Sequence, residues 1–579
     1  MLTPARWIFN ETVPGDIQDF ARELKVSAPV AALLWQRGYR NRDEAEAFLH
    51  PSVAKLHDPF SFLDMNAAVE RIAAAVRDRE RILLYGDYDV DGTTSVAVLA
   101  ATLRLMGADP VYHIPHRLRD GYGIHAEIIE QEATRGTRLI ISVDTGIRAG
   151  EEVLLAQRLG IDMIVTDHHL PDCDLPPARA VLNPNRRDST YPEKVLCGVG
   201  VTFKLVQALL SKSEWPQSKQ DRVLLSLLKL VAIGTIADVV PLTGENRTLV
   251  RLGLQGLRQT SSAGLTALLG VAGFRPGEVP TSGQISFRVA PRINAAGRMS
   301  DAGEVVEMFL TSDSGRAQAI AETLNRLNSE RQAAEQQIVQ EILAHCQSTP
   351  PRESDATLVF CGAEWHRGVV GIVASRLVER YSRPAFVLGG DGDSGLVQGS
   401  GRSIRAFSLV DALESMPDLF ERFGGHHMAA GVTLRLERVD SFRERLNTFA
   451  GGVLTADDMA PTLSVDVPVE AQYLGEDLAH EVETLGPFGF GNPTPVFALL
   501  GAEIADEPMV FAERHLRLRA RKDGRFLRFT AWQFAERKDD FVPGKLMDLA
   551  FTIDLDPRSA EKGYPGWVLN LKGARSATA

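Results

Sequence analysis

Residues 83–95 read LLYGDYDVDGTTS, an apolar segment followed by three aspartates at alternate positions, Asp87, Asp89 and Asp91. The segment RILLYG has the composition of a strand, whereas TTSVAVLAATLRLMG has helical periodicity and ends with Gly107 as a C-cap. The aspartates therefore lie where a strand passes into a helix. In an open α/β sheet, ligands bind at that edge.

The same aspartates also resemble the start of a calcium-binding EF-hand loop, because Asp87, Asp89, Asp91 and Gly92 match the pattern D-x-D-x-D-G. An EF-hand loop needs a bidentate glutamate at its twelfth position, where this chain has Val98. It also needs a helix before the loop, where the pattern here predicts a strand. Both departures argue against an EF-hand.

The composition is typical of an ordinary globular protein with several domains: 579 residues, 44% hydrophobic and 24% charged. No apolar run reaches the length of a membrane span and the first residues lack the pattern of a signal peptide, so we expect a cytoplasmic protein that does not contact a membrane. The net charge of -12 argues against coating nucleic acid through overall charge, but allows a local basic groove. The cysteines lack metal-binding spacing, and we expect buried thiols at Cys173, Cys197, Cys346 and Cys361.

Further apolar strands end in the same way as the first. The stretch TRLIISVDTG ends at Asp144, IDMIVTDHH ends at Asp167, His168 and His169, and ARAVLNPN is a fourth candidate strand. Helical stretches such as HAEIIEQEATRG and RAGEEVLLAQRLG lie between them. This β-α-β-α-β order predicts a parallel sheet with right-handed crossovers, and places the acidic residues at one edge.

One more acid completes a set. The stretch LLKLVAIGTIADVVPL predicts an apolar helix that runs into a Gly-Thr turn with Asp238 just beyond it. A single aspartate at a strand end usually caps a helix or forms a turn, but four such ends that all carry Asp or His favour a shared site. Clustered carboxylates repel one another unless a multivalent cation lies among them, and carboxylates with imidazoles suit Mn²⁺ or Mg²⁺. Two such ions would form a clamp for in-line displacement at phosphorus. The expected ligands are Asp89, Asp91, Asp144, His168 and Asp238.

The motifs DYDVDG, SVDTG, TDHH and GTIADVVPL are similar to the successive motifs of the DHH phosphoesterases, which are named after the triplet found here at residues 167–169. The resemblance implies two divalent ions, Mn²⁺ or Mg²⁺. The first would be bound by Asp89 and Asp144, and the second by Asp91, Asp144, His168 and Asp238.

The resemblance also implies roles for residues around the metals. His169 would contact the scissile phosphate or assist the leaving oxygen, Asp87 would orient its loop, and Arg117 would neutralise the scissile phosphate. Family II inorganic pyrophosphatases, which belong to this superfamily, have a histidine where this chain has Tyr85. The first metal site departs from their pattern at that position.

Beyond residue 300, the run SGRAQAIAETLNRLNSERQAAEQQIVQEILAHC predicts one long helix, too short and too irregular in its heptads for a coiled coil. Two glycine clusters follow, VQGSGRSIRAF and FGGHHMAAG, in which backbone N–H groups with Arg402 and Arg405 could bind phosphate. The stretch GGHHMAAG resembles the signature of the DHHA1 domain, which accompanies DHH domains in nucleic-acid-cleaving members. The resemblance implies substrate contacts from Arg298, Arg402, Ser403, Arg405, His426 and His427, with Arg298, Ser403 and Arg405 on a 5′-terminal phosphate.

The stretch HLRLRARKDGRFLRFTAWQF, residues 515–534, predicts a β-hairpin with a basic face. We expect Phe526, Phe529 and Trp532 to lie among the arginines of that face, as a single strand of nucleic acid requires. A solvated sheet face is the structural alternative. A small all-β domain that carries this hairpin fits an OB-fold.

The resemblance extends over nearly the whole chain, through IPHRLRDGYG, RINAAGRM and LGPFGFGNPTPVF, to the exonuclease branch of the DHH/DHHA1 superfamily. It implies a 5′→3′ exonuclease that hydrolyses single-stranded DNA to 5′-mononucleotides in recombination and repair. Such an enzyme would act as a monomer, with single-strand-binding protein and a RecQ-type helicase as partners. The alternatives are a DHH-family oligoribonuclease or nucleotide phosphatase, and a non-catalytic replication scaffold.

We therefore predict an α/β protein in which a parallel-sheet DHH phosphoesterase domain is joined by a long helix to a mixed α/β DHHA1 domain and followed by an all-β OB-fold. The expected segments are an N-terminal helical segment (1–54), the DHH catalytic domain (55–312), the connecting helix (313–348), the DHHA1 domain (355–452) and the OB-fold (460–579).

Overall fold

The computed structural model describes residues 5–10, 15–117, 119–352, 354–390, 395–561, 563 and 565–577. It divides into two compact units, which are described separately. The larger unit comprises Trp7–Gly297, Asp301–Ala321 and Leu463–Ala579, and the smaller unit comprises Met1–Arg6, Arg298–Ser300 and Glu322–Thr462.

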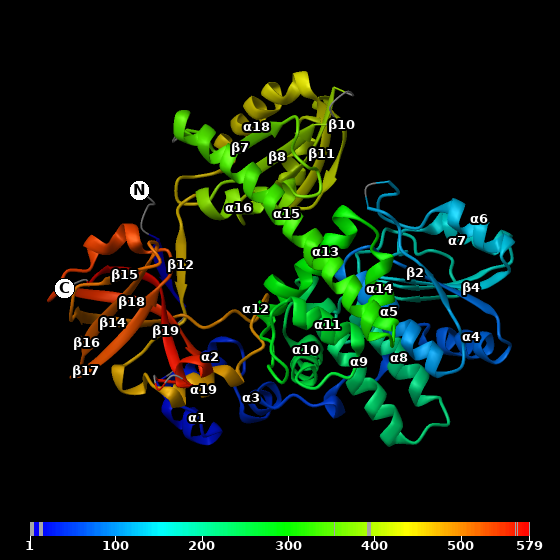
Figure 1. The fold of residues 1–579 in the computed structure, drawn as a ribbon, viewed down its shortest axis with the longest axis horizontal. Helices are drawn as coiled ribbons and strands as arrows, with labels where there is room; N and C mark the ends of the chain where they lie inside the picture. Colours follow the sequence, from blue (N-terminus) through cyan, green and yellow to red (C-terminus); the bar gives the residue numbers. More distant parts are fainter. Residues whose placement is uncertain are drawn as a thin grey trace. The chain divides into compact units, whose positions relative to one another are not determined.

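The larger unit contains the predicted parallel sheet, with strand order β3-β2-β4-β5-β6 and every neighbouring pair parallel. Apart from the half-buried β3, its strands are almost wholly buried, which explains their continuous apolar sequences. Figure 1 shows α6 and α7 on one side of the sheet and α4 on the other. The strands are β2 (Arg81–Gly86), β3 (Val111–His113), β4 (Thr137–Val143), β5 (Asp162–Thr166) and β6 (Ala180–Leu182), and the helices are α4 (Met65–Arg77), α5 (Val90–Leu105), α6 (Ala126–Thr134) and α7 (Gly150–Arg158).

A set of helices continues this domain beyond the sheet. Helix α9 (Gln217–Ala237) packs against α5, α8 and α10. It runs through Gly234 and Thr235 without interruption, so the Gly-Thr turn expected before Asp238 was wrong. Gly234 is a packing glycine, because a Cβ there would lie 2.5 Å from Oγ1 of Thr94. The other elements are α8 (Gly198–Ser211), α10 (Gly244–Leu257), α11 (Ala263–Val271), α12 (Ser282–Gln284), the π-helix η3 (Ile285–Val289), α13 (Ala290–Met299) and α14 (Gly303–Leu310).

The C-terminal domain of the larger unit is a β-rich barrel, as predicted. Its strands have the order β13-β14-β18-β19-β17-β16-β15, and a further pairing of β14 with β16 closes five of them into a ring. The β16–β17 hairpin turns at Asp523 and Gly524, both with positive φ, as a two-residue hairpin requires. The elements are β13 (Val467–Pro468), α19 (Glu476–Thr484), β14 (Phe497–Ile504), β15 (Met509–Phe511), β16 (His515–Lys522), β17 (Arg525–Ala531), β18 (Leu546–Leu555), α20 (Pro557–Ala560) and β19 (Trp567–Ser576).

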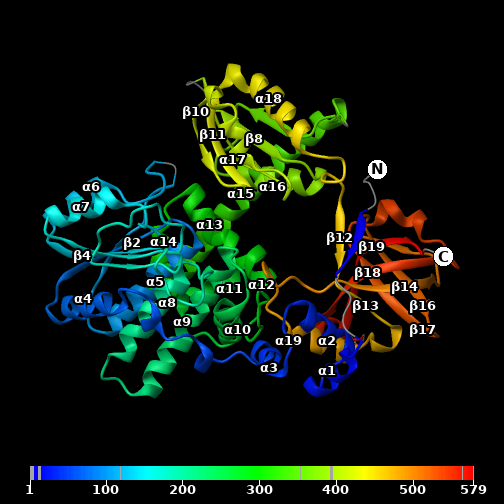
Figure 2. The same ribbon diagram turned by 180° about the vertical axis from the view of Figure 1, so that it is seen from behind.

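The chain's first helices belong to the core of this barrel. Buried side chains of α1 (Ile17–Leu24), α2 (Ala28–Gln36) and α3 (Arg42–Leu49) form one apolar cluster with buried side chains of the barrel strands and α19. Figures 1 and 2 show α1 and α2 beside α19. The segment expected to be helical also contains a strand, β1 (Arg6–Phe9), which pairs with β12 (Thr462–Val465).

The smaller unit contains most of α15 (Ser314–Ser348), the long helix predicted from the sequence, and a mixed sheet of order β10-β11-β9-β8-β7. Only the β7–β8 pair is parallel. Its elements are β7 (Leu358–Gly362), α16 (Val370–Tyr381), β8 (Ala385–Gly390), β9 (Leu396–Arg402), α17 (Leu409–Glu414), β10 (Phe420–Gly425), β11 (Ala429–Arg435) and α18 (Val439–Val453).

Among the described residues, no helix combines the length and apolar character needed to cross a bilayer. The expectation that all four thiols are buried was wrong for Cys173, which is exposed, and for Cys361, which is half-buried; Cys197 and Cys346 are buried.

Candidate metal centre

The parallel sheet brings the predicted ligands to one edge. Asp87, Asp89 and Asp91 follow β2, Asp144 follows β4, and residues 167–169 follow β5. Asp238 comes from the C-terminal end of α9, which packs against α5. Because parallel strands all end at the same edge, the local strand–acid pattern of the sequence becomes one spatial cluster.

Three groups of side chains in this cluster have ligand atoms within 4.8 Å of one another. The Nε2 atom of His168 lies 3.2 Å from Oδ1 of Asp144, 3.7 Å from Oδ2 of Asp238 and 3.9 Å from Oδ2 of Asp91. The groups are Asp87, Asp89 and Asp144; Asp91, His168 and Asp238; and Asp144, His168 and His169. The structure thus brings together all five predicted ligands, and places Asp87 beside Asp89 and Asp144.

The chemistry of this cluster fits divalent metal ions. Four of its buried ligand atoms have no hydrogen-bond partner among the described residues: Oδ1 of Asp87, Oδ1 of Asp144, Nε2 of His168 and Oδ2 of Asp238. Buried polar atoms are normally paired, so unpaired ones within such a cluster require an explanation such as an ion. Carboxylate and imidazole ligands without a thiolate suit Mn²⁺ or Mg²⁺.

The pKa values describe the same electrostatic strain. Burial and the neighbouring Asp89 raise the pKa of Asp87 to about 8 and that of Asp91 to about 7. Burial and Asp91 raise the pKa of Asp238 to about 9 and that of Asp144 well above its usual range. Without cations, carboxylates so close together hold protons at neutral pH, and a divalent ion would replace those protons.

The two histidines of the triplet differ in their protonation. Burial, together with the neighbouring His169, lowers the pKa of His168 to about 4, so its imidazole is neutral and available as a ligand. Burial also lowers the pKa of His169, but the hydrogen bond with Asp167 and the negative charges of Asp167, Asp91 and Asp89 together outweigh it and raise the pKa of His169. His169 is therefore the better proton donor of the pair.

The first residue of the triplet supports the other two. Asp167 is fully buried and accepts hydrogen bonds from Nδ1 of His169 (2.7 Å) and from the backbone N–H groups of Ile147 (2.9 Å), His168 (2.7 Å) and His169 (3.1 Å). These bonds keep the pKa of the Asp167 carboxyl below its usual range despite burial. Asp167 therefore fixes the loop and the orientation of His169.

Sequence reasoning missed several residues that hold the ligands. The N–H groups of Gly198 and Val199, at the start of α8, donate to the two carboxylate oxygens of Asp91 at 2.6 and 2.8 Å. After β6, Asn183 donates to the carbonyl of His169 (2.9 Å) and Asn185 to the carbonyl of His168 (2.6 Å). The Asn-Pro-Asn run after a strand was a visible signal, but its partners become neighbours only in the folded chain.

Two backbone conformations are unusual at this site. Asp144 has φ 60° and Val239, directly after Asp238, has φ 61°. This left-handed region is costly for residues other than glycine, and most of all for a β-branched valine.

Tyr85, at the position of the pyrophosphatase histidine, is fully buried and donates through its hydroxyl to the carbonyl of Gly123 (3.2 Å), so it is part of the core. The guanidinium of Arg117 lies over the ring of Tyr88, at 5.1 Å, and its charge acts on Asp87.

The residues predicted to bind the 5′-terminal phosphate and the nearby substrate lie in the smaller unit. Arg298 donates to the carbonyl of Gly368 (2.7 Å). The Ser403 hydroxyl donates to the carbonyl of Phe407 (2.7 Å) and its N–H to the carbonyl of Met428 (3.0 Å). His427 contacts the carbonyl of Arg405 through Nε2, at 3.0 Å. The structure thus brings Ser403 and Arg405 to the turn that carries His427. Across the same turn, the N–H of His426 donates to the carbonyl of Ala429 (2.8 Å). Arg402 is the last residue of β9.

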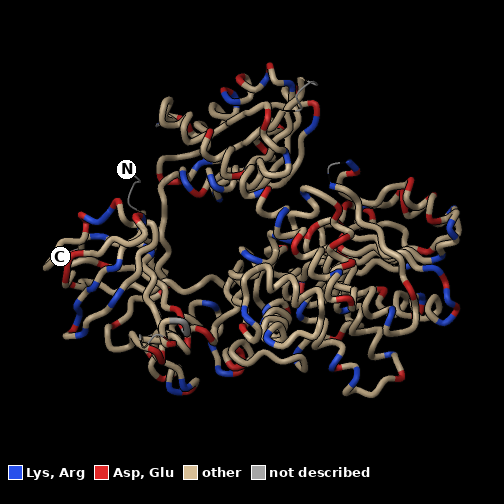
Figure 3. The backbone as a smooth tube through the Cα atoms, in the orientation of Figure 1, with Lys and Arg blue, Asp and Glu red and all other residues tan. Residues whose placement is uncertain are grey.

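The basic hairpin of the barrel has the predicted alternation, with one correction. Arg517, Arg519 and Arg521 face outward and the residues between them are buried. Phe526 and Trp532 are exposed, but Phe529 is buried in the barrel core, so its expected place on the basic face was wrong. Figure 3 shows basic residues along these strands interspersed with acidic ones, and Arg519 and Arg521 pair with Asp506 (2.6 Å) and Glu503 (2.8 Å).

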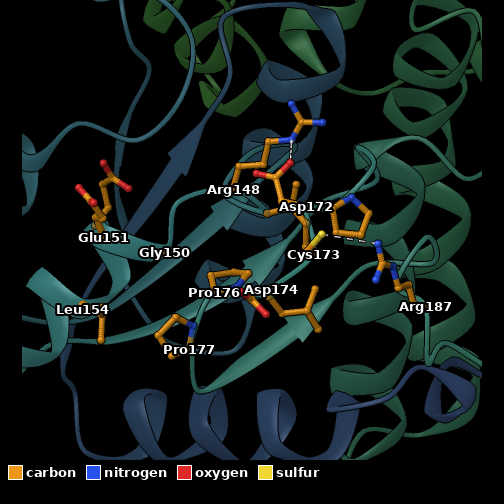
Figure 4. A pocket seen from close by; sticks show the side chains of 14 residues that line it. Arg148, Gly150, Glu151, Leu154, Asp172, Cys173, Asp174, Pro176, Pro177 and Arg187 are labelled. Atoms are coloured by element: carbon orange, nitrogen blue, oxygen red, sulfur yellow. Dashed lines mark hydrogen bonds and ion pairs between the residues drawn. The ribbon is translucent and has the colours of Figure 1, made fainter.

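A solvent-open pocket lies beside the loop after β4 (Figure 4). Its lining includes Arg148, which pairs with Asp172 (3.3 Å), and Arg187, whose guanidinium lies 3.9 Å from Sγ of Cys173. None of the predicted metal ligands lines it. The metal centre is therefore a separate site, formed by buried side chains at the sheet edge.

Comparisons with known proteins agree with this architecture. Three family models match: the DHH family N-terminal domain (residues 81–235), the DHHA1 domain (354–452) and the RecJ OB domain (465–559). The chain is 38% identical over 553 residues to the single-stranded-DNA-specific exonuclease RecJ of Bacillus subtilis, covering 95% of this chain and 69% of the relative. It is 37% identical to RecJ of Escherichia coli, covering 87% of each chain.

Solved structures give the same result. The crystal structure of RecJ from Thermus thermophilus in complex with Mn²⁺ superposes with a TM-score of 0.83 at 31% identity, over 99% of this chain and 80% of that one. The Mg²⁺ complex of the same protein gives a TM-score of 0.77 at 30% identity, over 99% and 79%. Three domains match family models, and the identity to these relatives extends over most of the chain. The chain therefore belongs to the RecJ family.

Proposed function

We propose that this protein is an exonuclease that degrades single-stranded DNA from the 5′ end to 5′-mononucleotides, in recombination and repair, with two Mn²⁺ or Mg²⁺ ions. The observation that carries the proposal is the cluster at the sheet edge, where four buried ligand atoms lack a hydrogen-bond partner. Its family relatives are named as single-stranded-DNA-specific exonucleases. One relative of the same fold has been solved in complex with Mn²⁺ and, separately, in complex with Mg²⁺.

The residues divide into two ligand groups with a common member. We assign Asp87, Asp89 and Asp144 to the first ion, and Asp91, Asp144, His168 and Asp238 to the second. When bound, two ions would lower the pKa of an attacking water and stabilise the charge that develops on the phosphate. His169, which Asp167 holds and keeps protonated to higher pH, would donate to a phosphate oxygen or to the leaving oxygen.

Binding of the DNA would involve other parts of the chain. Arg117 would neutralise the scissile phosphate, and Arg298, Ser403 and Arg405 would bind the 5′-terminal phosphate. Arg402, His426 and His427 would make further contacts with the substrate. The outward arginines of β16, with Phe526 and Trp532, would bind the strand further along. We expect the enzyme to work as a monomer in the cytoplasm, with single-strand-binding protein and a RecQ-type helicase as partners.

Five segments follow from this assignment: the N-terminal segment 1–54, the catalytic domain 55–312, the helix 313–348, the DHHA1 domain 355–452 and the OB-fold 460–579. Limited proteolysis under native conditions should cleave first near residues 349–354 and 453–459.

The test of the proposed function uses a long single-stranded DNA labelled separately at each end, incubated with purified protein and Mn²⁺, with duplex DNA, RNA and EDTA as controls. Immediate release of the 5′ label as mononucleotide, while the 3′ label stays on long products, is the expected result. Release of the 3′ label first would refute the polarity. Hydrolysis of short oligomers or phosphate esters alone would move the protein to the oligoribonuclease or nucleotide phosphatase branch. Binding of DNA without any hydrolysis would favour a scaffold.

A further inference from the structure

An unusually exposed aromatic side chain lies at the tip of a rigid loop close to the metal centre. The loop, residues 485–493 (the Phe490 loop), connects α19 towards β14, and the side chain of Phe490 is 62% exposed. A large apolar side chain exposed to this extent loses the free energy that its burial would contribute. A single exposed apolar side chain is common on a protein surface, but exposed rings gathered beside a functional site indicate a binding surface.

The loop is fastened by three arginines. Arg247, almost fully buried, donates to the carbonyl of Leu485 (2.7 Å), and Arg251 donates to the carbonyl of Gly486 (2.7 Å). Arg37 donates to the side-chain oxygen of Asn492 (2.7 Å) and to the carbonyl of Pro493 (2.7 Å). The buried Asn492 amide binds the carbonyls of Leu485 (2.9 Å) and Pro487 (2.8 Å). The loop therefore presents Phe490 on a fixed scaffold.

The loop also docks on the segment that follows the ligand Asp238. The N–H of Leu242 donates to the carbonyl of Phe490 (2.7 Å), and a Cβ on Gly491 would lie 2.8 Å from Cβ of Pro241. Four residues separate Asp238 from Leu242, so their Cα atoms are at most about 15 Å apart. A base stacked on Phe490 would therefore lie among the first few nucleotides from the metal centre.

A second exposed ring adjoins the same loop. The Ser282 hydroxyl donates to the carbonyl of Phe488, and five residues later Phe287 is 82% exposed on the π-helix η3. This π-helix packs against α9, whose end carries Asp238. Val239, beside that ligand, is 63% exposed. Phe287 and Phe490 thus lie on elements that the contact between Ser282 and Phe488 joins, and the Phe490 loop in turn contacts the segment after Asp238.

We propose that Phe490, with Phe287, is a stacking platform for unpaired bases among the first few nucleotides of the substrate. The proposal rests on the proposed function and adds to it: the platform would contact bases close to the scissile bond, through residues other than those of the barrel hairpin. Every base has a flat face, so stacking on a ring is tolerant of sequence, and two paired strands do not offer their faces to it. The platform would therefore select for unpaired DNA at the entrance to the metal centre.

The test combines a change in the protein with a change in the DNA. Kd is measured by fluorescence anisotropy in EDTA, and KM and kcat in Mn²⁺, for a 5′-phosphorylated 20-mer and for the same strand with abasic nucleotides at positions 2–5. Base–aromatic stacking contributes about 1–3 kcal/mol per base, so Phe490→Ala should bind the intact strand about 5- to 150-fold more weakly than the parent protein. It should also lose most of the parent's discrimination against the abasic strand, with kcat little changed.

The controls separate stacking from general damage. Phe490→Trp, which keeps a ring, should retain both affinity and discrimination, and Phe287→Ala measures the second ring. Leu105→Ala removes an exposed apolar side chain (54% exposed) from the opposite end of α5 and should behave as the parent. A Phe490→Ala protein with parental Kd and the full abasic penalty would overturn the proposal. Because the anisotropy arm needs no hydrolysis, a parent protein that binds and discriminates but does not cleave would refute the proposed function alone.

Discussion

Gly198 is the position where the smallest possible change should damage the metal centre. A Cβ there would lie 2.6 Å from both Cβ and Oδ1 of Asp144, whereas ordinary contacts begin at 3.4 Å. In Gly198→Ala, Asp144 or the start of α8 must therefore move by about 0.8 Å, the difference between these distances. Metal–ligand distances tolerate deviations of only about 0.2 Å. Asp144 belongs to two of the three ligand groups, so both ions should be affected.

We expect Gly198→Ala to bind Mn²⁺ about 10- to 100-fold more weakly, a loss of about 1.4–2.7 kcal/mol, and to lose cleavage in proportion at limiting Mn²⁺. Isothermal titration calorimetry of the EDTA-treated protein measures the affinity, and release of the 5′ label measures cleavage. Gly150→Ala is the matched control, because Gly150 is likewise the first residue of a helix and a Cβ there meets nothing within 4 Å. Parental Mn²⁺ affinity in Gly198→Ala would refute the argument that Asp144 depends on this close contact.

Three further predictions follow from the site. Asp91→Ala should reduce cleavage at least about 100-fold while single-stranded DNA binding in EDTA stays near parental; parental turnover at saturating Mn²⁺ would remove Asp91 from the ligands. Arg405→Ala should lose about 10- to 150-fold of any preference for 5′-phosphorylated over 5′-hydroxyl ends, measured as a ratio of kcat/KM, and an undiminished ratio would exclude it from the phosphate site. In the metal-free protein the raised pKa values of Asp87 (about 8), Asp91 (about 7) and Asp238 (about 9) mean that the folded state holds protons that the unfolded state has lost above about pH 4. Its Tm should therefore fall as pH rises from about 5 to about 8, and Mn²⁺ should abolish this fall; a flat Tm in EDTA would contradict the burial of these carboxyls.

The strands and their terminal aspartates could be predicted because their signals are local. A buried parallel strand is a continuous apolar run, and the acid that follows it is adjacent in sequence, as at Asp144. Position in the sheet then follows from the topology alone. The error at Phe529 could have been avoided in the same way. Residues in a strand alternate between its two faces, so Phe526 and Arg528 share one face and Phe529 lies on the other.

Features that depend on tertiary neighbours could not be predicted. Gly234 has the sequence signature of a turn, but in the structure it is a helical residue, and the close contact with Thr94 leaves no room for a side chain there. The bonds of Gly198 and Val199 to Asp91 join residues 107 and 108 positions apart. The support that Asn183 gives the histidine pair is similar in kind. In each case the residue type alone does not indicate the role, because the role depends on a partner that is distant in the sequence.

The shared core of the N-terminal helices and the C-terminal barrel has a consequence for how the chain is made. Helix α3 ends at Leu49, and the first barrel strand of that core begins at Val467. A ribosome adding about 5–20 residues per second needs roughly 20–80 s to pass from one to the other. During that interval the apolar faces of α1–α3 have been synthesised but their partners have not. Helices α1–α3 can therefore pack into their core only after the barrel strands have been synthesised, and by then the whole catalytic domain between them has already been made.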